Sequence, residues 1–244
     1  GKKLNIIDCP GSDDFVGAAL TALNVTDTAV LLLNGQYGAE VGTQNHFRYT
    51  EKLGKPVIFL VNQLDDEKCD YDAILEQLTS IYGNKVVPVQ YPIKTGPDFN
   101  ALIDVLLMKK YSWGPEGGEP TIEEIPEDQK EKAMEMHKVL VEAAAENDET
   151  LMEKFFETME LSAEDMAKGL QIGVREGSVC PVLCGSAVAD MGTLMLLDNI
   201  MELLPSPEQG NYHKATLADG TTEEFVVSAG GVPTAFVFKT ISDQ

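Results

Sequence analysis

The sequence predicts an α/β fold in which a doubly wound parallel sheet is interrupted by an inserted α+β subdomain. Strand-like and helix-like segments alternate through the first third of the chain, the pattern of βαβ units. The apolar runs at residues 29–33 and 57–61 are continuous rather than alternating, as expected of strands covered on both faces. A length of 244 residues suffices for one large domain, or two ordinary ones, with a buried core.

The first predicted domain, residues 1–85, carries the elements of the sheet at short spacing. Its expected strands and helices, in chain order, are residues 4–8 (strand), 15–24 (helix), 28–34 (strand), 42–53 (helix), 56–62 (strand) and 71–82 (helix). The last helix is followed by Gly83 and Asn84, which often terminate helices.

An inserted subdomain is predicted at residues 86–178, where the regular alternation stops. Its acidic helices are expected at residues 126–145, 149–159 and 162–175. Pro126 precedes two acids, which favours a helix start because proline fits the first turn and acids suit the positive end of the helix dipole. Ser162, with an acid three residues later, resembles a capping box.

The parallel sheet is expected to resume in residues 179–207, with a strand at 180–184 and a helix at 193–204. The sequence Pro-Ser-Pro at residues 205–207 predicts a domain boundary. Residues 208–244 then predict the start of a second, β-rich domain. Its short strand patterns are at residues 216–218, 223–228 and 234–241.

The composition argues against several classes of protein. A formal charge of -22 and a pI near 4.3 make the surface repel phosphate backbones and anionic lipid, so we expect no direct nucleic-acid binding. No apolar stretch approaches the roughly 20 residues of a membrane span, and a cytoplasmic protein without membrane contact is expected. In a strand, Cys180 and Cys184 would lie about 13 Å apart, so reduced thiols are expected. The three histidines show no metal-ligand spacing.

Three polar signatures follow predicted parallel strands. They are residues 8–11, 62–65 and 185–187, which read Asp-Cys-Pro-Gly, Asn-Gln-Leu-Asp and Gly-Ser-Ala. The carboxyl ends of parallel strands form one edge, where ligands bind in such sheets. Any one signature alone fits an ordinary turn that caps a strand, but the ordered combination indicates a nucleotide site.

These signatures resemble the third, fourth and fifth nucleotide-binding motifs of GTPases, and the surrounding sequence is similar to elongation factor G. The similar stretches are residues 5–11, 103–109, 142–149, 181–187 and 203–207, so the resemblance covers nearly the whole chain. It implies a P-loop GTPase-type sheet, the extra subdomain that the family carries within its G domain, and the start of a β-barrel second domain.

The resemblance implies that the fourth and fifth motifs read guanine. Asp65 would accept two hydrogen bonds from the guanine edge, a geometry that adenine cannot satisfy. Asn62 would support the base. Ser186 and Ala187 would form the fifth-motif loop, in which the Ala187 amide meets the guanine oxygen. Gln63 replaces the usual lysine of the family and retains part of its stem without the charge.

The third motif implies the phosphate end of the site, with GTP or GDP and Mg²⁺ as ligands of the full-length family. Asp8 would hold Mg²⁺ through water, and the Gly11 amide would sense the γ-phosphate. Ser12 stands where the family carries its catalytic histidine, and losing such a group typically costs roughly 10² to 10⁴ in rate. Asp13 adds an acid beside the expected γ-phosphate position. We therefore expect weak or absent GTP hydrolysis.

The sequence contains no Gly-x-x-x-x-Gly-Lys-Ser/Thr, the loop that supplies the amide cradle and the lysine for phosphates. In the family this loop and the first switch lie upstream of the Asp8 motif, so we expect the chain to begin after both and the sheet to lack its first strand. The base-reading hydrogen bonds offer roughly 1 kcal/mol each. No nucleotide is therefore expected to stay bound to this fragment, whose affinity should be about millimolar at best.

The resemblance implies a factor that promotes ribosomal translocation, with the ribosome and its stalk protein as partners of the full-length protein. In the family the inserted subdomain contacts the stalk. A second interpretation is a ribosome-protection or regulatory factor that has lost GTP turnover. A third, an unrelated nucleotide-binding or metabolic α/β domain, explains the sheet but not three ordered guanine motifs.

Overall fold

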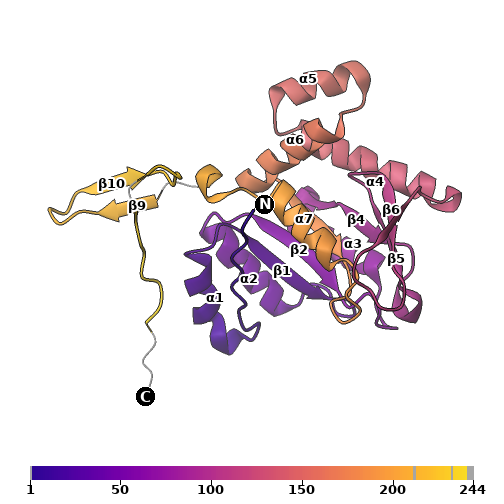
Figure 1. Ribbon diagram of the computed structural model, residues 1–244, viewed down its shortest axis with the longest axis horizontal. Coiled ribbons are helices and arrows are strands. Elements are labelled where there is room, and N and C mark those ends of the chain that lie inside the picture. Colours follow the sequence, from indigo (N-terminus) through magenta and orange to yellow (C-terminus); the bar gives the residue numbers. More distant parts are fainter. Residues whose placement is uncertain (1, 211–212, 232, 241–244) are drawn as a thin grey trace.

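A computed structural model describes residues 2–210, 213–231 and 233–240 (Figure 1). Its central feature is a four-stranded sheet in the order β1-β2-β8-β3, and every neighbouring pair is parallel. The strands are β1 (Ala29–Asn34), β2 (Val57–Asn62), β3 (Val86–Pro88) and β8 (Cys180–Cys184). The predicted parallel sheet is thus confirmed, and β3 extends it beyond residue 85.

Helices connect and cover this sheet. They are α1 (Val16–Leu23), which follows the 3-10 turn η1 (Asp13–Phe15), α2 (Val41–Lys52), α3 (Tyr71–Tyr82), which is followed by the turn η2 (Gly83–Lys85), and α7 (Thr193–Leu203). Phe47 of α2 stacks on Phe59 of β2, with ring centroids 5.7 Å apart, and Tyr82 of α3 lies 4.2 Å from Phe47. The strand β8 is buried along its whole length, as a strand covered on both faces must be.

The insert forms a second, antiparallel sheet in the order β4-β5-β6-β7, followed by three helices. Its elements are β4 (Gln90–Pro92), the turn η3 (Gly96–Asp98), β5 (Ala101–Asp104), β6 (Lys109–Ser112), β7 (Thr121–Glu123), α4 (Glu127–Ala145), α5 (Glu149–Thr158) and α6 (Ala163–Glu176). Val89 joins the two sheets, because its N–H donates to Val182 O at 3.0 Å and its C=O accepts from Val105 N–H at 2.9 Å.

The helices of the insert begin and end where local chemistry predicts. The Ser162 hydroxyl accepts a hydrogen bond from the Asp165 N–H at 3.1 Å, and α6 ends at Gly177 in a left-handed conformation with φ 78°. The Asp148 carboxylate caps α5 in the same way. Pro126 is the residue before α4 rather than part of its first turn.

The predicted strand at residues 4–8 is wrong. The segment is exposed, with Ile6 77% accessible, and no described strand forms a ladder with it. A strand needs a hydrogen-bonded neighbour, and β1, the edge of the described sheet on this side, pairs only with β2 within the described residues. Figure 1 shows this N-terminal stretch as an extended segment near α7, where Lys2 Nζ donates to Met201 O at 2.7 Å.

The chain after α7 passes through the turn η4 (Pro207–Gln209) into an antiparallel hairpin that projects from the body (Figure 1). Its strands are β9 (His213–Thr216) and β10 (Thr222–Phe225). The strand predicted at 216–218 is wrong beyond residue 216, because Leu217 N–H donates to Thr221 O at 2.8 Å and residues 217–221 connect the two strands. The strand predicted at 223–228 forms only as far as residue 225. Residues 233–240 form no strand, so the strand predicted at 234–241 is wrong up to residue 240, and residue 241 lies outside the described residues.

One hydrophobic core extends through both sheets and the helices of the insert. Its fully buried members include Phe59 and Val182 of the parallel sheet, Ile103 of the antiparallel sheet, and Leu140 and Leu170 of the helices. The insert is therefore packed directly against the parallel sheet by buried side chains, and is not merely tethered to it by the chain. The division into four domains remains a prediction. No helix within residues 2–210, 213–231 and 233–240 is both long and apolar enough to span a bilayer.

Candidate functional site

The carboxyl edge of the parallel sheet brings the fourth and fifth motifs together. Asn62 ends β2, and its Oδ1 accepts a hydrogen bond from the Ala187 N–H at 2.9 Å across 125 residues of sequence. The backbones are joined as well, because Leu64 N–H donates to Gly185 O at 3.2 Å and Gly185 N–H donates to Val61 O at 3.0 Å. The two loops therefore form one unit, as their positions after adjacent parallel strands predict.

The fifth-motif loop is held rigidly by its own backbone. Ser186 is 1% exposed, and it exchanges two backbone hydrogen bonds with Met191, at 2.8 and 3.0 Å. The Ser186 hydroxyl accepts from the Ala189 N–H at 3.2 Å. A Cβ on Gly185 would lie 2.6 Å from Met191 O, so only glycine fits without a shift. Ser186 therefore shapes the loop from inside, while Ala187 lies exposed with its N–H directed to Asn62.

Asp65 has an unmet demand for hydrogen-bond donors. Its side chain is half-buried, and its Oδ1 is covered without a partner among the described residues. Leaving such an oxygen unsatisfied costs about 1 to 3 kcal/mol. The neighbouring Asp66 is satisfied locally, because its Oδ1 accepts from the Lys68 N–H at 2.8 Å. Of the two acids, Asp65 is therefore the one whose carboxylate keeps an unsatisfied oxygen among the described residues.

Asn34 and Gly35 belong to this edge, although the sequence reasoning missed both. Asn34 ends β1 opposite Asn62, and its Nδ2 donates to Gln63 Oε1 at 2.6 Å. Gly35 is buried, and a Cβ there would lie 2.8 Å from Asn62 O and 2.9 Å from Gln63 O. The signal that could have found them is an Asn-Gly pair directly after an apolar strand.

The electrostatic field beneath the site is negative. The pKa of the Cys69 thiol is raised to about 11. Burial is the largest cause, and the nearby negative carboxylates of Asp66, Asp70 and Asp65 raise it further. The thiol therefore stays protonated at neutral pH. Such a field favours the N–H groups of a base over phosphate oxygens.

The predicted phosphate-end residues lie apart from this cluster. Asp8, Gly11 and Ser12 are all exposed. The Ser12 C=O accepts from Phe15 N–H at 2.9 Å at the start of η1, and Gly11 O lies 3.7 Å from the position that a Cβ on Gly42 would occupy. No hydrogen bond joins these residues to the fourth or fifth motif within the described residues, which also contain no group of three potential metal ligands.

Comparison with known proteins identifies the family to which this chain belongs. Residues 1–206 match the family described as the elongation factor Tu GTP binding domain. The chain belongs to this family. The resemblance drawn from the motifs is confirmed, and the chain is a translational GTPase G domain, in which the second sheet and its helices form an insert.

Two relatives place this G domain more closely. It is 30% identical to the elongation factor G-like protein of Thermotoga maritima over 244 residues, which is 100% of this chain and 35% of that protein. A solved structure, that of the Thermus thermophilus protein named ttk003000868, is 36% identical with a TM-score of 0.75, over 82% of this chain and 30% of that one. The G domain thus spans about a third of each of these relatives.

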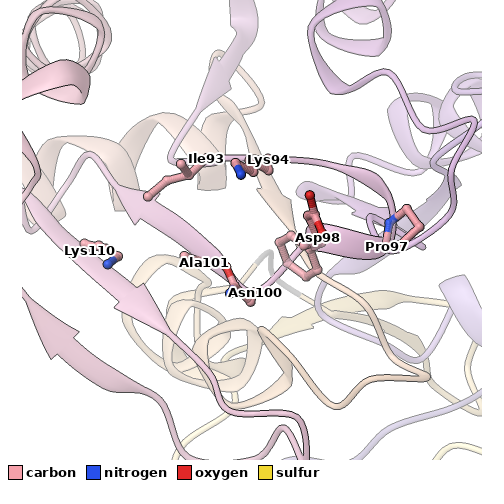
Figure 2. Close-up of a pocket in the computed structure, with 8 residues that line it drawn as sticks. Ile93, Lys94, Pro97, Asp98, Asn100, Ala101 and Lys110 are labelled. Carbon is pink, nitrogen blue, oxygen red and sulfur yellow. The ribbon is translucent and has the colours of Figure 1, made fainter.

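The G domain also has a cavity of about 390 Å³ on its insert. Figure 2 shows its lining, which comes from β5, β6 and the connection between β4 and β5. Lys94, Asp98 and Lys110 are its charged residues, and Lys110 is already paired with Glu123 at 3.0 Å. None of the predicted site residues lines it. The loop that lines it is nevertheless joined to the fourth motif, because Gly96 N–H donates to Leu64 O at 2.8 Å.

Proposed function

We propose that this G domain belongs to a translation factor of the elongation factor G type, which selects guanine nucleotides and hydrolyses GTP weakly or not at all. The observation that carries the proposal is the 2.9 Å hydrogen bond from the Ala187 N–H to Asn62 Oδ1, which closes the fourth and fifth motifs beside the unsatisfied Asp65. The residues present fit the base of a guanine nucleotide.

Guanine recognition follows from the donors on its edge. Guanine presents N1–H and an N2 amino group side by side, and the Asp65 carboxylate can accept from both. Adenine has no proton at N1 and no amino group at C2, so the half-buried carboxylate would stay unpaired, at a cost of about 1 to 3 kcal/mol. The Ala187 N–H, held by Asn62 in this structure, would be shared with the guanine oxygen when the base binds.

The substitution Asp65→Asn tests base selection. Xanthine carries an oxygen where guanine carries its amino group, so an amide at position 65 should lose GDP affinity by at least about tenfold and gain affinity for xanthosine diphosphate. Fluorescence titration of the complete gene product with labelled nucleotides measures both. Asp66→Asn is the matched control and should leave the preference for guanine unchanged. An Asp65→Asn variant with unaltered guanine preference would rule out this site.

The phosphate end is proposed on the family resemblance alone. Asp8 would hold Mg²⁺ through water, and the Gly11 amide would meet the γ-phosphate. The 244 residues contain no phosphate-binding loop of the family's pattern. This chain alone should therefore bind GDP with a dissociation constant of about millimolar or weaker. Calorimetric titration that gave micromolar binding would contradict this proposal.

Weak hydrolysis is proposed because Ser12 replaces an imidazole that would orient the attacking water. A serine hydroxyl is shorter and carries no positive charge. In the complete gene product with ribosomes, Ser12→His should raise GTP turnover by roughly 10² or more if the remaining machinery is intact. Turnover by the unaltered protein at the rate of a histidine-bearing elongation factor G would refute the proposal.

The proposed partners are the ribosome and its stalk protein, with contact to the stalk through the insert. Figure 1 shows α5 at the far end of the insert, and Phe156 on this helix is 72% exposed. Exposed aromatic side chains are common anchors of interfaces. Phe156→Ser should weaken binding of isolated stalk protein to the complete gene product by about tenfold, whereas Val188→Ser, at the fifth-motif loop, should not. If the two variants bound the stalk protein with equal affinity, α5 would be excluded as the contact site.

The natural departures from the family pattern at Ser12 and Gln63 favour a second candidate function, a ribosome-protection or regulatory factor without GTP turnover. Both residues lie within the third and fourth motifs. Ser12 stands in place of a histidine that transfers protons, and Gln63 stands in place of a positively charged lysine. A translocation assay on programmed ribosomes separates the two functions. Movement of the messenger by one codon supports a translocation factor, and ribosome binding without movement supports the second function.

A further inference from the structure

The residue at the lysine position of the fourth motif is held in a strained conformation. Gln63 has φ 64°, in the left-handed region that costs a residue with a side chain roughly 1 to 2 kcal/mol. Its side chain is nevertheless exposed to solvent, where burial cannot hold it in place. Its described side-chain hydrogen bond is the one at 2.6 Å from Asn34 Nδ2.

Asn34 is in turn fixed so that its amide can face only one way. Its Oδ1 accepts from Gln36 N–H at 2.8 Å and from Tyr37 N–H at 3.3 Å. Because backbone N–H groups only donate, the oxygen must face them, and Nδ2 must point to Gln63. An amide nitrogen only donates, so Gln63 must present Oε1 to Asn34 and direct Nε2 away from it.

The backbone next to this pair packs closely against the fourth motif. Gly35 follows Asn34, and a Cβ there would lie 2.8 Å from Asn62 O and 3.0 Å from Cys69 Sγ. The turn after β1 is therefore pressed against the fourth motif, with the Asn34 side chain at the contact. The orientation of the Gln63 amide is set by a residue 29 positions earlier in the chain.

We infer that Asn34 is a positioning residue of the guanine site, on which nucleotide affinity depends. It orients Gln63 so that the Nε2 of a neutral side chain, in place of a flexible lysine, is the free donor beside the base. This inference rests on the proposed function of Asp65, Asn62 and Ala187. It adds that nucleotide affinity in this chain depends on a pair formed across β1 and β2.

A double-mutant cycle tests the pair. Asn34→Asp keeps the oxygen that caps Gln36 and Tyr37 but removes the donor to Gln63, while Gln63→Leu removes the acceptor at an exposed position. In the complete gene product, Asn34→Asp should weaken binding of N-methylanthraniloyl-GDP about fivefold or more in the native background. In a background that already carries Gln63→Leu, any loss should come only from the added charge and be at least about threefold smaller.

Controls separate this inference from structural damage and from added charge. Asn24→Asp makes the same chemical change at the end of α1, where Asn24 Nδ2 donates to Leu20 O, and should leave nucleotide affinity unchanged. Gln63→Leu alone should also weaken binding several-fold, which tests the pair if Asn34→Asp fails to fold. Equal losses for Asn34→Asp in both backgrounds, or unchanged affinity for Gln63→Leu, would overturn the inference while leaving the guanine site standing. Competition by ADP as effective as that by GDP in the unaltered protein would overturn the proposed function, and this inference with it.

Discussion

At the scale of single residues, the chain places a carboxylate at the junction of its two four-stranded sheets. Asp104, at the end of β5, is 2% exposed. Its Oδ1 accepts from the Leu106 and Leu107 N–H groups at 3.0 and 2.9 Å, and its Oδ2 accepts from Gln90 Nε2 at 3.3 Å. Burial raises the pKa of Asp104 from 3.8 to about 6, against these hydrogen bonds, which favour the ionised form. The junction is therefore sensitive to pH.

The pH dependence of stability follows from the sign of that shift. Because the folded chain holds the Asp104 proton more tightly than the unfolded chain, the stabilisation is complete below the unfolded pKa and is lost as the pH rises through the folded pKa. With a pKa that moves from 3.8 to about 6, the loss is on the order of 2 to 3 kcal/mol between these values. Asp104→Asn should remove this dependence, so its unfolding free energy relative to the native chain should rise by about 2 kcal/mol from pH 4.5 to 7. Urea unfolding at both pH values measures it, with exposed Asp98→Asn as control. A constant difference across this range would contradict the prediction.

A second residue-scale prediction concerns the fifth-motif loop. Gly185→Ala places a Cβ 2.6 Å from Met191 O, so the loop must shift, at a cost of about 1 to 3 kcal/mol. Gly17→Ala in α1 is a matched control, because no atom lies within 4 Å of its Cβ position. That change should stabilise the chain by about 0.5 to 1 kcal/mol. Thermal unfolding should show the two midpoints moving in opposite directions, and a shared direction would argue against the strain.

At the scale of elements, the helices of the insert depend on side chains at their first turns. Ser162 exchanges hydrogen bonds with Asp165, from the Asp165 N–H at 3.1 Å and to the Asp165 carboxylate at 3.0 Å. Lys154 of α5 also bonds Asp165, at 3.0 Å, so the start of α6 and the middle of α5 are linked. These contacts are exposed, so the ion pair adds little to the free energy of unfolding. Their main contribution comes from the Ser162 hydroxyl, which accepts a hydrogen bond from a backbone N–H in the first turn of α6.

The cap prediction follows from that difference. Ser162→Ala should lower the unfolding free energy by about 1 kcal/mol, because one N–H of the first turn loses its acceptor. Ser80→Ala, at an exposed position inside α3, should be neutral or slightly stabilising, since alanine favours helix. Chemical unfolding with both variants measures the difference. Equal effects would show that the hydroxyl does not cap α6.

At the scale of the whole molecule, the insert and the parallel sheet share one core, whereas the hairpin β9–β10 projects from it (Figure 1). The described side chains of residues 214–231 are almost all exposed. One link back to the body is the Ala229 N–H, which donates to Glu208 Oε1 at 3.0 Å. The hairpin therefore contributes little buried apolar area to the stability of the G domain.

Removing the hairpin should leave the G domain folded. A chain that ends at residue 210 should unfold within about 2 °C of the chain of 244 residues, because exposed residues bury little surface. Calorimetry of both chains compares the midpoints. A fall of about 5 °C or more on removal of the hairpin would show that it belongs to the core.

The sequence by itself determined the elements whose signals are local. The continuous apolar runs at 29–33 and 57–61 became β1 and β2, and Ser162 opened α6, because burial pattern and cap chemistry act over a few residues. The three motifs indicated the family, because their order and flanking residues can be recognised in the sequence without the fold. The strand predicted at 4–8 failed, because an apolar run becomes a strand only when a neighbour completes its hydrogen bonds.

Only the tertiary structure decided the contacts that give the motifs their geometry. The Asn62–Ala187 bond spans 125 residues and the Asn34–Gln63 bond spans 29, and both depend on the register of neighbouring strands. Nothing local in the sequence fixes that register or the order β1-β2-β8-β3. The sequence could therefore name the residues of the motifs, but only the packed sheet could show that Asp65 Oδ1 lacks a partner among the described residues and that Asn34 donates to Gln63.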